Sequence, residues 1–96
     1  MPVFIVAQLK FVDRERYNRY LAKFADVFRK FDGKALAAAE NPQVLEGEAG
    51  PDKIVVLEFP SEAAAQKFHN DPEYMEIAAD RKAGANGLVL QFKGIG

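Results

Sequence analysis

Two stretches of sequence decide the fold of this chain: FIVAQL at residues 4–9 and IVVLEF at residues 54–59. Side chains in a strand alternate between two faces, so each stretch places apolar residues on both faces of a sheet. One face takes Ile5, Ala7, Leu9, Val55, Leu57 and Phe59, and the other takes Phe4, Val6, Gln8, Ile54, Val56 and Glu58. A strand that is apolar on both faces needs a cover on each side.

The second cover has to come from outside the chain. Helices supply one cover, but a chain of 96 residues is too short to supply both. We therefore expect a homodimer, in which a second copy covers the other face, since an exposed apolar patch usually marks an interface. Gln8 and Glu58 are polar side chains on that face, and they are expected to lie inside a cavity that the two copies share.

Composition limits the class of protein. The length predicts one domain over residues 1–96, and a hydrophobic fraction of 49% argues against disorder. A net charge of −1 gives no electrostatic basis for binding nucleic acid. No apolar run approaches the roughly 20 residues of a membrane span, and the first residues carry no signal-peptide pattern. We expect a soluble cytoplasmic protein with neither nucleic acid nor a membrane as partner.

Metal and thiol chemistry have no basis in this composition. The chain contains no cysteine, which removes disulfides and thiolate metal sites. It contains one histidine, His69, which excludes a histidine-rich zinc site. We expect neither a metal nor a cofactor.

The first half of the chain predicts a strand, a helix and an edge strand. The strand covers residues 3–11, and Asp13 is a good N-cap for the helix that follows. Gly33 stands where a left-handed C-cap residue is expected. The apolar stripe of this helix follows three-and-four spacing and contains Tyr17, Tyr20, Leu21, Phe24, Val27, Phe28 and Phe31. An edge strand is expected over 34–40 and 43–46, broken by a bulge at Asn41-Pro42.

The second half repeats that pattern. A strand is expected over 53–59, followed by a short helix that Ser61 caps and that ends near His69. Asp71 and Pro72 begin a further helix, because proline is tolerated in a first turn. The inner face of that helix takes Tyr74, Ile77, Ala78 and Arg81. A loop is expected over 84–87 and a last strand over 88–92.

The resulting order, strand-helix-strand-strand-helix-strand, predicts an α+β ferredoxin-like βαββαβ fold with helices on one face of a four-stranded sheet. We expect the strands at 3–11 and 53–59 to be adjacent and parallel at the sheet centre, which makes Gln8 and Glu58 near neighbours. The helices are expected to cover the face of Ile5, Leu57 and Leu90. The face of Phe4, Val56 and Val89 is then left for dimerisation.

Several segments resemble the DUF1330 family. They are, in chain order, Val44-Leu45-Glu46-Gly47, the run from Ile54 to Ser61, Phe68, Asp71-Pro72-Glu73-Tyr74 and Arg81. The resemblance spans nearly the whole chain and implies a dimeric α/β barrel, in which two ferredoxin-like sheets close face to face. The superfamily also holds cofactor-free monooxygenases, muconolactone isomerases and stress-response barrel proteins, so the resemblance implies no particular reaction.

The chain departs from the family pattern at two places. An aromatic residue often follows the Glu-Gly turn, where Glu48-Ala49 stand here, and a tyrosine commonly follows Phe68, where His69 stands here. If the family's aromatic residues line a ligand site, the ligand of this chain differs.

Glu58 and His69 are the candidate catalytic residues. A carboxylate on an apolar face has a raised pKa, as a general acid or base requires, although Glu58 also suits a structural role bonded to Gln8, Arg81 or a partner chain. His69 is the side chain whose ordinary pKa lies nearest neutrality, although a histidine at a helix end often only favours the helix dipole.

Four residues are candidates for binding a ligand: Gln8, Tyr17, Tyr74 and Arg81. Arg81 suits a substrate carboxylate, or it only stabilises the end of its helix. The tyrosines, Tyr20 included, have the spacing of core residues with hydroxyls at the edge of the core.

The amino-acid sequence leaves three functions open. The chain is a small-molecule-binding protein, a cofactor-independent isomerase or monooxygenase acting on a small aromatic or acidic compound, or a structural module whose own side chains fill the space. The bulk of Phe4, Val6, Ile54 and Val56 gives the last alternative its basis.

Overall fold

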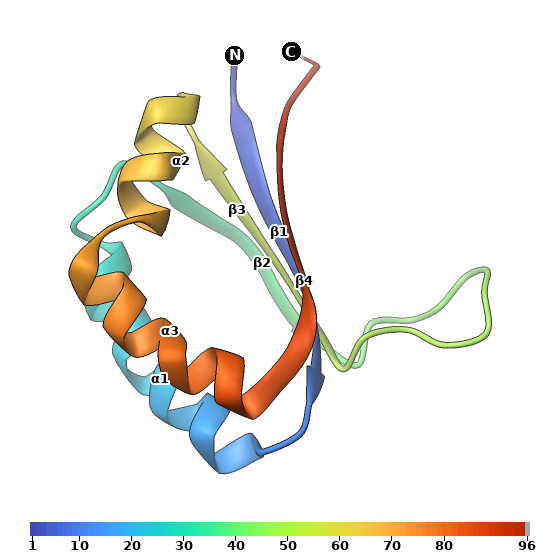
Figure 1. Cartoon of the computed structure of the whole chain (residues 1–96). Helices are drawn as coiled ribbons and strands as arrows, with labels where there is room; N and C mark the ends of the chain where they lie inside the picture. The colour runs from blue at the N-terminus through green and yellow to red at the C-terminus, as the bar shows by residue number, and fades with distance from the viewer. Residues whose placement is uncertain (96) are drawn as a thin grey trace.

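A computed structural model describes residues 1–95 as one sheet backed by one layer of helices (Figure 1). The elements follow in the order β1 (Val3–Phe11), α1 (Arg14–Phe28), β2 (Lys34–Glu40), β3 (Lys53–Phe59), α2 (Glu62–His69), α3 (Pro72–Gly84) and β4 (Ala85–Lys93). This order confirms the predicted α+β ferredoxin-like fold.

The sheet of the described residues has four strands in the order β2-β3-β1-β4, and every neighbouring pair is antiparallel. β1 and β3 are therefore adjacent, as predicted, but their predicted parallel orientation is wrong. The crossover through α1 leaves a gap of one strand between β1 and β2. The chain then turns back after β2, so β3 fills that gap running against both neighbours.

This antiparallel register separates the two polar residues that the sequence had placed together. Phe4 lies opposite Glu58, and Gln8 lies opposite Ile54. Gln8 and Glu58 are on the same face but at opposite ends of the paired strands. The prediction that they are near neighbours is wrong.

The two faces of the sheet have different environments. On the face toward the helices, Val3, Ile5, Leu57 and Phe59 are buried, as predicted for β1 and β3. The predicted faces of β4 are wrong, because Leu90 lies opposite Val6 and Val89 lies opposite Ala7. The large apolar side chains of β4 on the face without helices are Leu88, Leu90 and Phe92, and all three are exposed.

An aromatic cluster fixes α1 and α2 to the sheet. The rings of Phe28 in α1 and Phe59 in β3 meet edge to face at a centroid distance of 6.0 Å. Phe68 of α2 lies 5.2 Å from the ring of Phe28 and 5.5 Å from that of Phe59. Such pairs add to the hydrophobic burial of the rings. One cluster therefore joins three elements from both halves of the chain.

The helix N-caps follow the sequence, but the predicted C-cap of α1 does not. Asp13, Ser61 and Asp71 each accept a backbone hydrogen bond in the first turn of their helices. α1 ends at Phe28 with Arg29 as a right-handed cap, so Gly33 is not a C-cap residue. A Cβ at Gly33 would lie 2.7 Å from a ring carbon of Phe28 and from one of Phe59, so the glycine leaves room for these rings.

β2 is an edge strand, as predicted, but it ends at Glu40, and residues 43–46 are not a strand. The irregularity in its pairing lies between Ala35 and Ala37 rather than at Asn41-Pro42. The segment 41–52 is a loop that projects on the side of the sheet away from the helices (Figure 1). Asn41 has a φ of 54°, a left-handed conformation that asparagine tolerates.

α3 passes directly into β4, so the predicted loop over 84–87 is wrong. The backbone carbonyl of Gly84 accepts hydrogen bonds from the amides of Val12, at 2.9 Å, and Asp13, at 3.0 Å. A Cβ at position 84 would lie 2.5 Å from the backbone nitrogen of Tyr17 and 2.7 Å from the carbonyl oxygen of Asp13. Glycine is therefore needed where the end of α3 meets the start of α1.

We expect Gly84→Ala to lower the free energy of unfolding by about 1–3 kcal/mol, because the added methyl group meets backbone that cannot move aside. Urea denaturation followed by circular dichroism measures the change. Gly50→Ala is the matched control, since its Cβ would meet only a side-chain methyl of the exposed Val44. An equal loss in both variants would contradict the importance of this contact.

Candidate ligand cavity

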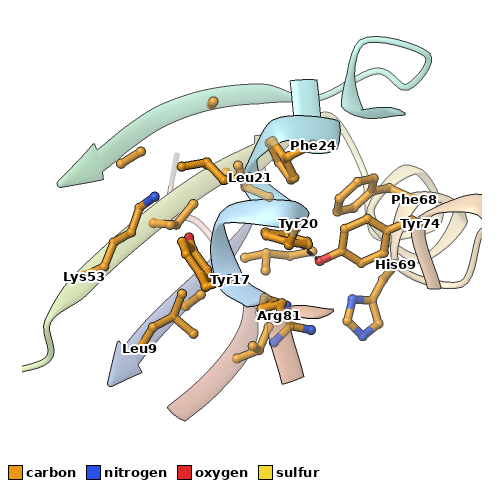
Figure 2. Close-up of a pocket in the computed structure, with 17 residues that line it drawn as sticks. Leu9, Tyr17, Tyr20, Leu21, Phe24, Lys53, Phe68, His69, Tyr74 and Arg81 are labelled. Carbon is orange, nitrogen blue, oxygen red and sulfur yellow. Dashed lines mark hydrogen bonds between the residues drawn. The ribbon is translucent and has the colours of Figure 1, made fainter. Parts of the chain in front are cut away.

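A cavity lies between the helices and the covered face of the sheet (Figure 2). Most of its wall is apolar or aromatic, and its charged or titratable side chains, apart from tyrosines, are Lys53, His69 and Arg81. The cavity has a volume of about 70 Å³. A single water occupies roughly 10–15 Å³ of such a volume, so the space fits a compact ligand rather than an extended one.

Two tyrosine hydroxyls meet at one side of the cavity (Figure 2). The hydroxyl oxygens of Tyr20 in α1 and Tyr74 in α3 lie 3.1 Å apart and form a buried hydrogen bond. Burial, with a further contribution from Tyr74, raises the pKa of Tyr20 far above its ordinary value. Tyr20 therefore keeps its proton and serves as a hydrogen-bonding group.

Arg81 presents a buried charge to the cavity. It lies in the last turn of α3 and is only 7% exposed. Its guanidinium carbon is 5.9 Å from the ring centroid of Tyr20, and its Nε has no hydrogen-bond partner within residues 1–95. Within the same residues, no carboxylate lies within ion-pair distance of it. Buried charges are normally paired, so this guanidinium is poised for an anion.

Lys53 is also buried, at 4% exposed, and its positive charge acts on the nearby carboxylate of Glu40. Its Nζ lies 4.9 Å from the ring centroid of Tyr17, and Glu40 is its partner across the β2–β3 pair. Arg14 binds Glu40 through hydrogen bonds of 2.8 and 2.9 Å, and this contact, with a smaller contribution from Lys53, lowers the pKa of Glu40. Glu40 is not part of the cavity wall, so its negative charge offsets that of Lys53 from outside the cavity.

His69 lies at the end of α2, beside Tyr74 and Arg81 (Figure 2). Its ring centroid is 6.0 Å from that of Tyr74. Partial burial lowers the pKa of His69 below its ordinary value of 6.5, and the positive charges of Arg81 and Lys82 lower it further. The imidazole is therefore neutral near pH 7 and is able to accept a proton.

The structure brings together four of the six predicted site residues. Tyr17, His69, Tyr74 and Arg81 line the cavity, whereas Gln8 and Glu58 lie on the opposite face of the sheet. Glu58 lines a separate hollow with Pro2, Asp32, Lys34, Phe59 and Pro60. The alternative that Glu58 pairs with Gln8 or Arg81 is wrong, because neither side chain is near it.

Lys53 and Tyr20 are cavity residues that the sequence analysis did not assign to a site. Lys53 lies two residues before Val55 and four before Leu57, so strand alternation already placed its side chain on the covered face. Tyr20 had been assigned to the core because of its helical spacing. Its hydroxyl partner comes from α3, 54 residues away, and no local pattern predicts that contact.

Two further observations limit the chemistry of the described residues. No group of three or more histidine, cysteine, aspartate or glutamate side chains is arranged to hold a metal ion within residues 1–95. In the same part of the chain, no helix is both long enough and apolar enough to cross a bilayer.

The fold and the cavity define a ferredoxin-like α+β protein with a small ligand-sized space between sheet and helices. The chain belongs to the family described as domain of unknown function (DUF1330), whose model matches residues 2–95. This confirms the family that the sequence motifs resembled. A search of curated proteins found no match.

Solved structures support the fold. A protein of unknown function from Rhodopseudomonas palustris is 21% identical, with a TM-score of 0.83 over 99% of this chain and 83% of that one. SnoaB from Streptomyces nogalater, described as a cofactor-independent oxygenase, is 13% identical, with a TM-score of 0.70 over 97% and 92%. A protein from Thermobifida fusca, described as dimeric and ferredoxin-like, is 13% identical, with a TM-score of 0.70 over 98% and 92%. At these identities the likeness shows the fold alone.

We expect His69 to titrate below pH 6.5, and we expect Arg81→Gln to raise its pKa, because the substitution removes a nearby positive charge. The increase is partial, since burial remains. An NMR titration of the imidazole measures both values, and the single histidine of the chain makes the signal unambiguous. An unchanged titration curve in Arg81→Gln would show that the guanidinium does not act on His69.

We expect Tyr20→Phe to lower the free energy of unfolding by about 0.5–1.5 kcal/mol, because the hydroxyl of Tyr74 loses its partner. Tyr74→Phe should cost a similar amount. The double variant should cost less than the sum of the two, since both single changes break the same bond. Urea denaturation of the three variants tests this, and strict additivity would contradict the bond.

Proposed function

We propose that this chain is a small-molecule-binding protein that acts as a homodimer in the cytoplasm, folded as one ferredoxin-like unit over its length. The observation that carries the proposal is the cavity, whose walls are apolar while Tyr20, Tyr74, His69 and Arg81 converge at one side. Binding sites for small molecules typically combine an apolar concave wall with a few convergent polar groups. The space left between the layers argues against a module filled by its own side chains.

The uncovered face of the sheet supports the homodimer. Phe4, Val6, Val56, Leu90 and Phe92 share this face, and Leu90 and Phe92 are about half exposed. An apolar surface of this kind usually marks an interface. The Thermobifida fusca protein, which has the same fold, is described as dimeric. A second copy of the sheet, with the same apolar surface, is the partner that suits this face.

A cofactor-independent enzyme is the second candidate, and His69 favours it. The imidazole lines the cavity, and its lowered pKa leaves it free to accept a proton near pH 7. SnoaB, described as a cofactor-independent oxygenase, has the same fold. Glu58 is not part of this proposal, since it lies on the other face. Turnover of small lactones or quinols that His69→Gln abolishes would favour the enzyme, whereas binding without turnover favours the binding protein.

We expect sedimentation equilibrium at micromolar concentration to find a dimer and Leu90→Glu to convert it to a monomer, because the substitution puts a charge on the apolar face that the dimer would bury. Met75→Glu is the matched control. It places the same charge at an exposed apolar position of α3, on the helix side of the molecule, and should leave the dimer intact. A native monomer in the unmodified chain would contradict the homodimer.

We expect Ala38→Leu to weaken the binding of small aromatic compounds, because the larger side chain takes up space where β2 lines the cavity. Chemical shifts in NMR spectra during titration with phenol and benzamide measure the binding. Ala79→Leu, at an exposed position of α3 outside the cavity, is the control and should bind as the unmodified chain does. Equal affinity in the two variants would place the ligand elsewhere.

A further inference from the structure

Resting on the proposed binding function, we infer that the ligand is a small monocarboxylic acid with an aromatic or branched apolar body. Its carboxylate binds the guanidinium of Arg81, and its body lies against the aromatic wall of the cavity. The carboxylate and the apolar body have different partners, so the orientation of the ligand in the cavity is specified as well as its chemical class.

The guanidinium of Arg81 lacks an anion within residues 1–95. It lines the cavity, and the Nε–H is buried without an acceptor within residues 1–95. A buried donor that lacks an acceptor costs free energy, and a buried cation that lacks an anion costs more. A carboxylate in the cavity removes both costs at once, because the planar fork of arginine matches the two oxygens of a carboxylate.

The hydroxyl pair provides a second donor beside the guanidinium. Tyr20 and Tyr74 share one hydrogen bond, so one of the two hydroxyls donates within the pair and the hydrogen of the other is left for a ligand. Figure 2 shows Arg81 beside Tyr20, on the side where the two hydroxyls meet. A carboxylate that accepts from both groups satisfies more of its lone pairs than arginine alone allows.

Charge balance favours a monocarboxylate over a phosphate or a dicarboxylate. Lys53 is a second buried cation of the wall, but the carboxylate of Glu40, opposite it in the β2–β3 pair, offsets part of its charge. Near Arg81 the cavity holds one uncompensated positive charge and a histidine that is neutral near pH 7. One negative charge balances it, whereas a phosphate ester carries about −1.5 to −2.

Lys82 separates this role from a general effect of charge at the helix end. Arg81 and Lys82 both lie in the last turn of α3, where a positive charge favours the helix dipole. Lys82 is exposed and does not line the cavity. A purely structural role predicts that both residues stabilise the free protein, whereas an anion site predicts that removal of the unpaired buried charge of Arg81 is neutral or stabilising.

The test compares benzoate with benzamide, which has nearly the same shape and no charge. Calorimetric titration of the unmodified chain at pH 7 should find that benzoate binds about tenfold tighter or more, the preference expected of a charge-assisted hydrogen bond. Arg81→Met should abolish this preference without lowering the melting temperature of the free protein. Lys82→Met, which removes the same charge from the same turn, should keep it.

A second measurement needs no variant and decides the question if Arg81→Met does not fold. Addition of benzoate should move the Nε–H resonance of Arg81 in the unmodified chain, and benzamide should leave it in place. Equal affinity for the two compounds, an unmoved resonance, or loss of the preference in Lys82→Met would overturn the inference while leaving a binding cavity. Binding of neither compound would overturn the proposed function as well.

Discussion

The arrangement of this protein depends on the antiparallel pairing of β1 with both β3 and β4. β1 is the strand that joins the two halves of the sheet, and its register decides which side chains share a face. Because side chains alternate with a period of two, this single register places Lys53 and Val55 against the helices and turns Glu58 away from them. The contents of the cavity and the composition of the uncovered face both follow from it.

Much of the fold was predictable from local patterns. The N-caps at Asp13, Ser61 and Asp71 are encoded within a few residues and were confirmed, as was the burial of most of the α1 stripe. Two stripe predictions were wrong, because Leu21 is 41% exposed and Phe31 lies beyond the end of the helix. Strand direction was not predictable from local patterns, because it depends on how the whole chain returns after each crossover. The faces of β4 failed for the same reason, since alternation within a strand says nothing about its register with a neighbour. The predictions for Gly33 and Gly84 were wrong because close packing requires these glycines, against the rings of Phe28 and Phe59 at Gly33 and against the backbone of α1 at Gly84.

The candidate site was predictable only in its residue types. Arg81, His69 and Tyr74 stood out as side chains able to do chemistry, and the fold brings them to one cavity. Glu58 stood out for the same reason, but it lies on the face of the sheet away from the cavity. The chemical type of a side chain does not say which other residues the fold brings close to it. The property that makes Arg81 distinctive is the lack of a partner around its Nε. This property arises from how the folded chain packs, and the sequence alone does not reveal it.

Hydrogen bonds join the two ends of the loop between β2 and β3. The amide of Asn41 donates to the carbonyl of Asp52 at 2.7 Å, and the carboxylate of Asp52 accepts from the amide of Phe11 at 2.9 Å. These hydrogen bonds hold the two ends of the loop together, so the sheet does not depend on the residues between them. Doubling the length of a flexible loop costs only about 0.6 kcal/mol in closure entropy. Evolution can therefore lengthen, shorten or decorate this segment in related chains while the cavity on the far side of the sheet keeps its shape.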